Sequence, residues 1–244
     1  MNLMNDLTTV DGSGAGTPPS AADLITAAYG RYGPHVALVS SFGAEAAVML
    51  HLVSQVSRHI PVIVLDTLLL FPETLAYQRS LSAHLGLSDV RLIRPDEGAD
   101  PDRTLHQSDS QACCHLRKVA PLAKALEGFE AVLTGRKQFQ TDARKDLGPM
   151  DQDAQGRVRI NPLYDWSAEQ TQAYLSDHDL PLHPLVAHGY ASIGCMPCTT
   201  PVKAGEDARA GRWRGEARQE CGIHYCNGKL QRGLQRGPET RCSA

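Results

Sequence analysis

The sequence predicts an α/β fold, with a mostly parallel sheet flanked by helices. Strand-like apolar runs alternate with segments of helical periodicity between residues 35 and 135. The runs at 35–41 and 61–65 are short and largely apolar, as in strands covered on both faces. Such alternation is typical of parallel strands joined by helices. With 244 residues, 42% of them hydrophobic, the chain can bury a core without disulfide support.

The expected elements follow in order along the chain. Ser20 can cap the first helix, which Gly30 ends, and Pro72 suits the first turn of the third. Pro121 predicts a kink or a restart in the fourth helix. The expected strands are 35–41, 61–65, 89–94, 129–134 and 158–163. The expected helices are 21–29, 44–56, 72–86, 113–128 and one capped by Ser167.

Charge is spread unevenly along the chain. Residues 203–244 carry nine Lys or Arg against five Asp or Glu, while the whole chain has a net charge of −3. A cationic tail on an acidic body indicates an anionic small ligand or partner. A solvated basic tail is the alternative. Nucleic acid is not expected as a partner, because basic and aromatic residues are not interleaved.

The N-terminus carries no recognisable targeting signal. Residues 1–20 lack the charged region and apolar core of a secretory signal, and no apolar run reaches the ~18 residues of a membrane span. We therefore expect a cytoplasmic protein without a membrane partner, in which the cysteines do not form a disulfide framework. Residues 1–19, which end in a Gly- and Pro-rich stretch, are expected to be disordered.

Three polar segments follow expected strands. They are 40–45 (SSFGAE), 66–71 and 134–140. In open parallel sheets, ligands bind beyond the carboxyl ends of the strands. The first segment combines hydroxyls, a glycine and a helix start, which can bind an anion, but it is not a Walker loop. Taken alone, the first segment is better interpreted as an ordinary strand-to-helix turn, and the second is equally compatible with a polar turn followed by a helix cap.

The seven cysteines all lie in the second half of the chain, and four of them form two close pairs. Cys113 and Cys114 are adjacent, and Cys195 and Cys198 form a CxxC motif. Adjacent cysteines on a helix point about 100° apart, which suits a polynuclear cluster better than a single zinc ion. We therefore favour a [4Fe–4S] cluster over zinc. A redox CxxC is the other alternative, and it leaves the first pair unexplained.

A fifth cysteine is the candidate nucleophile. Cys221 has Arg218 and His224 as near neighbours, and cationic neighbours raise the thiolate fraction. The alternative is a surface cysteine in a frayed tail. Guanidinium forks suit phosphate and sulfate oxygens. The candidate side chains for binding such anions, five arginines and two lysines, are Arg136, Lys137, Arg144, Lys145, Arg209, Arg212 and Arg214.

Taken together, these segments resemble the thioredoxin-dependent adenylylsulfate reductases of the wider adenylylsulfate/phosphoadenylylsulfate reductase family. The matching segments run from about residue 21 to residue 224: SSFGAEA, LDT, LFPET, CC with RK, TGR, NPLYDW, GCMPCT, GRW and ECGIH. The resemblance implies an adenine-nucleotide α-hydrolase-like fold related to the ATP pyrophosphatases. It also implies reduction of adenylylsulfate to sulfite and AMP, with thioredoxin as electron donor and self-association into dimers or tetramers.

The resemblance also implies roles for individual residues. Cys221 would be the nucleophile, with Lys118, Arg209, Arg212 and His224 engaging the sulfate and phosphate. The [4Fe–4S] ligands would be Cys113, Cys114, Cys195 and Cys198. The nucleotide contacts would be Ser40, Ser41, Phe42, Gly43, Glu45, Leu65, Asp66, Gly135 and Arg136. Residues 20–202 would form the nucleotide- and cluster-binding domain, and 203–244 a mobile arm carrying the nucleophile.

Two segments depart from the family pattern. Leu68 stands where a glycine is usual, and Lys137 and Gln138 replace two successive arginines. Either one anion contact is absent, or Arg136 or Arg144 supplies it. The nearest alternative function is reduction of phosphoadenylylsulfate, although reductases specific for it generally lack the cluster. An ATP-dependent adenylating enzyme and a zinc-bound nucleotide sensor are the other two alternatives.

Overall fold

The computed structural model describes residues 18–153 and 155–216, together with residues 220, 221 and 223 and the backbone of 225, 226, 229 and 230. Most of the expected disordered segment 1–19 and about half of the expected arm 203–244 therefore lie outside the described residues. Within the described part, no helix combines the length and the apolar character needed to cross a bilayer.

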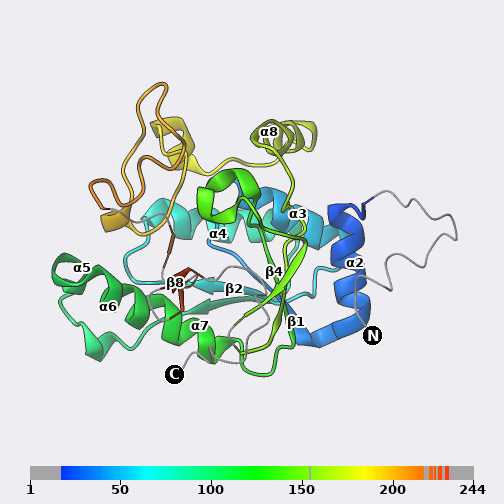
Figure 1. Ribbon diagram of the computed structural model, residues 1–244, viewed down its shortest axis with the longest axis horizontal. Coiled ribbons are helices and arrows are strands. Elements are labelled where there is room, and N and C mark those ends of the chain that lie inside the picture. The colour runs from blue at the N-terminus through cyan, green and yellow to red at the C-terminus, as the bar shows by residue number, and fades with distance from the viewer. Residues whose placement is uncertain are drawn as a thin grey trace, which may run out of the picture.

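A six-stranded sheet forms the centre of the molecule, and five of its strands run parallel (Figure 1). In sheet order the strands are β3 (Val90–Ile93), β2 (Val62–Leu65), β1 (Val36–Val39), β4 (Ala131–Thr134), β6 (Val158–Ile160) and β5 (Met150–Gln152). The mostly parallel sheet confirms the predicted class. Strand β5 was not predicted, and it pairs antiparallel with β6 at the sheet edge.

The helices begin and end at the residues that their caps dictate. Ser20 forms a capping box with Asp23, and Ser167 forms one with Gln170. Gly86 ends the third long helix in a left-handed conformation. The α-helices are α2 (Ala21–Tyr32), α3 (Ala46–Val56), α4 (Pro72–Leu85), α5 (Leu105–Ser108), α6 (Ser110–Cys114), α7 (Ala120–Ala125) and α8 (Ala168–Asp177). The expected single helix at 113–128 is therefore divided into the end of α6, a connecting turn and α7.

A π-helical turn, η3 (His115–Val119), joins α6 to α7. Pro121 stands in the first turn of α7. Proline lacks an N–H, and its ring would collide with the carbonyl of Arg117, four residues earlier, in a regular α-helix. The wider turn avoids this collision, because π-helical bonds reach one residue further along the chain. The predicted interruption at Pro121 is confirmed, and its form is a π turn.

Helices cover both faces of the sheet (Figure 1). Side chains of β1 alternate between two apolar clusters: Val36 and Leu38 join the larger one, beneath α2, α3 and α4, and Ala37 joins the smaller one, beneath α7. Burying one aliphatic side chain contributes about 1.5–3 kcal/mol. Two-sided burial is the reason why the strand is apolar throughout.

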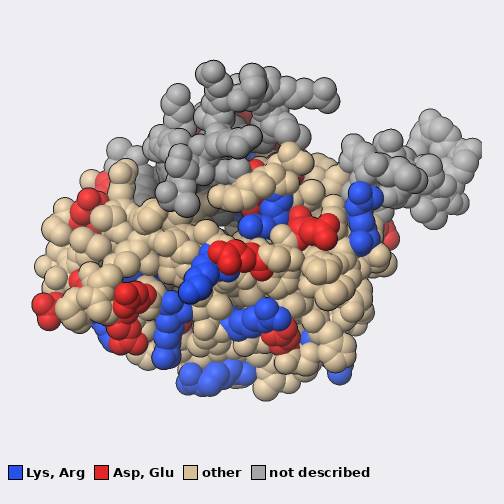
Figure 2. Space-filling view, turned by 90° about the horizontal axis from the view of Figure 1, so that it is seen from below, with Lys and Arg blue, Asp and Glu red and all other residues tan. Residues whose placement is uncertain are grey.

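Opposite charges lie next to one another on the surface. Figure 2 shows Lys and Arg groups interspersed with Asp and Glu groups over the described part of the face seen from below. Arg91 pairs with Asp89 at 2.6 Å, and Arg214 pairs with Glu206 at 2.9 Å. Exposed pairs of this kind contribute about 1 kcal/mol or less. The charges that matter for a ligand are therefore the buried ones.

Candidate active site

A cavity of about 320 Å³ opens at the carboxyl ends of β1, β2 and β4. Strand β1 lies between β2 and β4, so the chain leaves this part of the sheet in two opposite directions. Ligands of doubly wound sheets bind at such a switch point. The structure brings together the three predicted polar segments here, joined by residues 191–195 and 207–213.

The loop after β1 presents Ser40, Ser41 and Gly43 to the cavity. Phe42 between them is fully buried in the core and has a left-handed backbone with φ of 49°. Its N–H donates to Ser40 Oγ at 3.2 Å. Left-handed backbone costs a non-glycine residue roughly 1–2 kcal/mol, which the buried ring offsets. Phe42 thus anchors the loop, and its neighbours face the cavity.

Asp66 does not line the cavity, although Leu65 and Thr67 on either side do. Its Oδ2 accepts from Arg94 Nε at 2.9 Å, and its Oδ1 accepts from the Leu68 N–H at 3.1 Å. The register of β2 and β3 places these two charged residues at adjacent strand ends. Asp66 therefore shapes the loop, with Leu68 in a left-handed conformation at φ of 60°.

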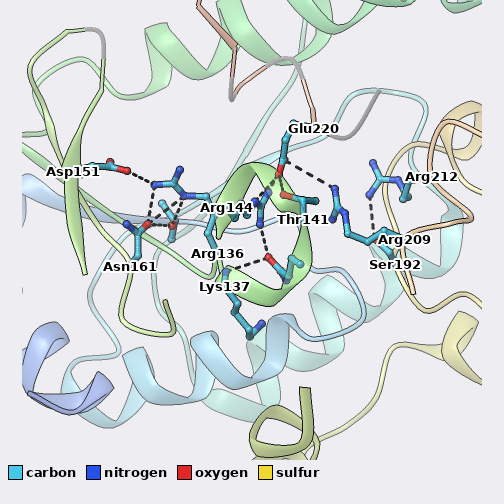
Figure 3. A network of polar contacts seen from close by, with 12 residues as sticks. Arg136, Lys137, Thr141, Arg144, Asp151, Asn161, Ser192, Arg209, Arg212 and Glu220 are labelled. Atoms are coloured by element: carbon cyan, nitrogen blue, oxygen red, sulfur yellow. Dashed lines mark hydrogen bonds and ion pairs between the residues drawn. The ribbon is translucent and has the colours of Figure 1, made fainter. Parts of the chain in front are cut away.

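The loop after β4 carries two buried cations, each already paired, and Figure 3 shows the contacts of Arg136. Arg136 donates to Asp151 at 3.0 Å and to Asn161 at 2.9 Å, and burial lowers its pKa to about 10 although Asp151 opposes the shift. Lys137 Nζ lies 2.8 Å from Glu45 Oε2. Gly135, Arg136 and Glu45 all line the cavity. The guanidinium of Arg136, however, is already hydrogen-bonded to Asp151 on the edge strand β5 and to Asn161, which directly follows β6.

Two further arginines lie against one tryptophan. The Trp213 ring is 4.3 Å from the Arg212 guanidinium and 5.8 Å from that of Arg209. Arg212 donates to the Cys198 carbonyl at 3.3 Å, and it packs so closely on Gly194 that a Cβ there would collide with it. Burial lowers the pKa of both arginines, that of Arg209 to about 10. Both arginines line the cavity.

Cys221 lies in the same cavity beside a lysine. Lys118 Nζ donates to Cys221 Sγ at 3.1 Å. A hydrogen bond from Cys114 and the charge of Lys118 hold the pKa of the Cys221 thiol well below its ordinary value, against the effect of burial. Burial would lower the pKa of Lys118, but the neighbouring thiols outweigh it and raise the pKa. His224, predicted to act here, lies outside the described residues.

The two cysteine pairs meet between α6 and η7 (Met196–Cys198). Cys113 and Cys195 are buried in one small apolar cluster against Leu69, with Cys198 packed on it. Cys114 hydrogen-bonds to Cys221 instead. Within the described residues, no group of three or more His, Cys, Asp or Glu side chains is arranged to hold a metal ion.

The surroundings of these thiols fit an anionic group. Thr67 Oγ1 lies 3.1 Å from Cys195 Sγ. Arg117, whose charge acts on Cys113, has its Nε buried without a hydrogen-bond partner in the described part of the chain. A buried, unsatisfied donor is costly, and an anion beside it would remove the cost. Four thiols, two from α6 and two from the η7 segment, with such a donor nearby are chemically suited to hold an iron–sulfur cluster.

Sequence reasoning gave no role to several residues that shape the site. Thr67, Trp213 and Glu220 fall within matched segments, and Lys137 was considered only as a cation for phosphate or sulfate and as a replacement for an arginine. The GRW segment, with two arginines near an aromatic residue, could have indicated the stacked pair. Nothing local indicated that Lys137 is buried, because its partner Glu45 lies 92 residues away.

The fold and the cavity define an α/β protein of the adenine-nucleotide α-hydrolase-like type. The phosphoadenosine phosphosulfate reductase domain family matches residues 35–201. An adenosine 5′-phosphosulfate reductase of Mesorhizobium japonicum is 50% identical over 193 residues, which is 78% of this chain and 76% of that protein.

Solved structures show the same fold. A phosphoadenylyl-sulfate reductase of Candida auris, solved with phosphate, has a TM-score of 0.67 at 25% identity, over 81% of this chain and 96% of that one. Yeast FAD synthetase has a TM-score of 0.54 at 17% identity, over 82% and 73% of the two chains. The chain belongs to the phosphoadenosine phosphosulfate reductase family and is an oxidoreductase, as the resemblance predicted.

Proposed function

We propose that this protein reduces adenylylsulfate to sulfite and AMP in assimilatory sulfate reduction, with Cys221 as the nucleophile. The observation that carries the proposal is the 3.1 Å contact between Lys118 Nζ and Cys221 Sγ inside a strand-end cavity. Arg209 and Arg212 line the same cavity and supply positive charge for the sulfate and phosphate. The family of the chain supports the same reaction.

In the first step, the Cys221 thiolate attacks the sulfur of the sulfuryl group. An S–S bond forms, the bond between that sulfur and the phosphate oxygen breaks, and AMP leaves with the electron pair. The product on the enzyme is a thiosulfonate, Cys221–S–SO3⁻. Lys118 keeps the thiol ionised, and the arginines reduce repulsion between two anions and stabilise the charge that develops on the leaving phosphate. His224 is proposed to contact the same anion.

In the second step, thioredoxin supplies two electrons. One of its thiolates attacks the Cys221 sulfur, so that sulfite leaves and a mixed disulfide forms, and its second thiol then releases the enzyme. This chemistry needs free thiols, in keeping with a cytoplasmic location. Because one cysteine must meet both a nucleotide and a protein, residues 203–244 are proposed to act as a mobile arm. Assembly into a dimer or tetramer is part of the same proposal.

The proposed cofactor is a [4Fe–4S] cluster held by Cys113, Cys114, Cys195 and Cys198. When bound, it would join α6 to the loop at η7, and Lys118 would link it electrostatically to the substrate sulfate. Coordination would remove the proton that Cys114 shares with Cys221, and Lys118 would then be the remaining side-chain donor to the nucleophile. No step of the proposed reaction transfers electrons through the cluster.

The decisive experiment mixes the purified protein with adenylylsulfate in the absence of thioredoxin. We expect the mass of one SO3 group on the peptide that contains Cys221, and sulfite release when thioredoxin is added. Cys221→Ser should bind AMP but gain no mass. Modification of Cys226 in its place would show that another thiol is the nucleophile.

Phosphoadenylylsulfate is the second candidate substrate. The Candida auris relative is named a phosphoadenylyl-sulfate reductase. This name supports the same chemistry on a nucleotide that carries a 3′-phosphate. The two close cysteine pairs favour adenylylsulfate. Comparing kcat/KM for the two nucleotides separates the candidates, and a clear preference for the 3′-phosphorylated one would reverse our choice.

A further inference from the structure

Glu220 is a buried carboxylate that no step of the proposed reaction uses. Its side chain is 1% exposed. Oε1 accepts from Thr141 Oγ1 at 2.9 Å and from Arg144 Nε at 2.6 Å, and Oε2 accepts from Arg144 Nη2 at 2.7 Å (Figure 3). Arg209 Nη2 lies 4.0 Å from Oε2. A two-pronged arginine contact of this kind is both strong and directional.

These contacts connect segments far apart in the sequence. Arg144 ends the short turn η5 (Asp142–Arg144), 76 residues before Glu220. Cys221 follows Glu220 directly, with its Cα about 3.8 Å further along the chain. The position of the thiol is therefore tied to the position of the carboxylate. On its other side, the thiol meets Lys118 at 3.1 Å.

We propose that Glu220 is the positioning residue of the reaction: its paired contact with Arg144 and Thr141 holds the Cys221 thiol against Lys118. This inference rests on the proposed function, since it takes Cys221 as the reacting thiol. Displacing a reacting atom by about 1 Å can slow a reaction about 100-fold. Glu220→Gln keeps the shape of the side chain but removes the negative charge to which Nε and Nη2 of Arg144 donate.

A matched control exists in the same part of the chain. Glu206 also pairs with an arginine, Arg214, at 2.9 Å, but both side chains are partly exposed. In Glu220→Gln we expect SO3 transfer to Cys221, followed by mass in a single turnover, to slow about 100-fold. AMP affinity, measured by calorimetry, should change by no more than about twofold. Glu206→Gln should match the wild type.

Two outcomes of this comparison contradict the inference. One is SO3 transfer at the wild-type rate in Glu220→Gln. The other is a parallel loss of rate and AMP affinity, which would make Glu220 a binding residue. Thermal unfolding is recorded for each variant. Should Glu220→Gln fail to fold, Thr141→Val removes one neutral donor to the same carboxylate and should slow the transfer about tenfold, and an unchanged rate would contradict the inference.

A second measurement does not depend on the reaction. A short amine-to-thiol cross-linker should join Lys118 to Cys221 in the wild type and in Glu206→Gln, with at least about a tenfold lower yield in Glu220→Gln. An undiminished yield in Glu220→Gln would show that the carboxylate does not position the thiol. If the wild type is cross-linked but accepts no SO3, the proposed function fails, and the cross-link yield still decides the role of Glu220.

Discussion

His183 is a buried imidazole whose protonation should make the fold sensitive to acid. It is 1% exposed and lies between α4 and η6 (Pro184–His188). Nδ1 accepts from the Leu185 N–H at 3.1 Å, so the neutral ring carries its proton on Nε2, 2.9 Å from Thr74 Oγ1. Burial lowers the pKa of His183 to about 4, although Glu73 opposes the shift.

The size and sign of the effect follow from this pKa. Between the folded value of about 4 and the ordinary value of 6.5, the unfolded chain binds a proton that the folded chain does not. The stabilisation by neutral His183 is therefore complete above pH 6.5 and is lost as the pH falls toward 4. At about pH 5 the loss amounts to about 2 kcal/mol of the free energy of unfolding.

The assay is urea unfolding of wild type and His183→Asn at about pH 7.5 and pH 5. The asparagine Oδ1 can still accept from the Leu185 N–H, but the side chain does not titrate. We expect the wild type to lose about 2 kcal/mol more than the variant between the two conditions. His188→Asn, which removes an exposed imidazole from the same turn, is the control. Identical pH dependence in wild type and His183→Asn would refute the reasoning.

Three further predictions concern the site. Lys118→Met should slow SO3 transfer to Cys221 at least about 100-fold, measured by mass, because the stabilising charge is lost, whereas Lys124→Met on the exposed side of α7 should not. Gly194→Ala should displace the Arg212 guanidinium and weaken AMP binding about tenfold by calorimetry, with an unchanged circular dichroism spectrum. Cys198→Ser should lower the iron content and the visible absorption of anaerobically purified protein, and an iron content equal to that of the wild type would remove Cys198 from the ligand set.

The centre of the sheet could be predicted because β1, β2 and β4 are buried on both faces, so that apolar runs mark them. Strand β5 escaped prediction because Met150–Gln152 has no β-branched residue and is held by Asp151, which pairs with Arg159 on β6 and with Arg136. An edge strand of this kind is stabilised by contacts between side chains, and these depend on a register that composition does not reveal.

The cavity could be predicted in outline, but the partner of each charged residue could not. Asp66 followed a strand as a ligand-binding residue would, yet the register of β2 and β3 brings Arg94 to it. Lys137 looked like a surface charge, and it is buried against Glu45. Such pairings depend on distances between strand ends, which follow from the three-dimensional arrangement and not from local spacing.

The π-helical turn at 115–119 sets the rotational phase between two parts of one helical segment. Each residue of an α-helix advances the helix by about 100°. A π-helical turn takes up one residue more than an α-helical turn, so winding the same residues as a regular α-helix would rotate Cys113 and Cys114 by about that angle relative to α7, which is packed beneath the sheet. The thiol pair would then face away from the η7 loop. The winding of this segment is thus as strictly required as the identity of its cysteines.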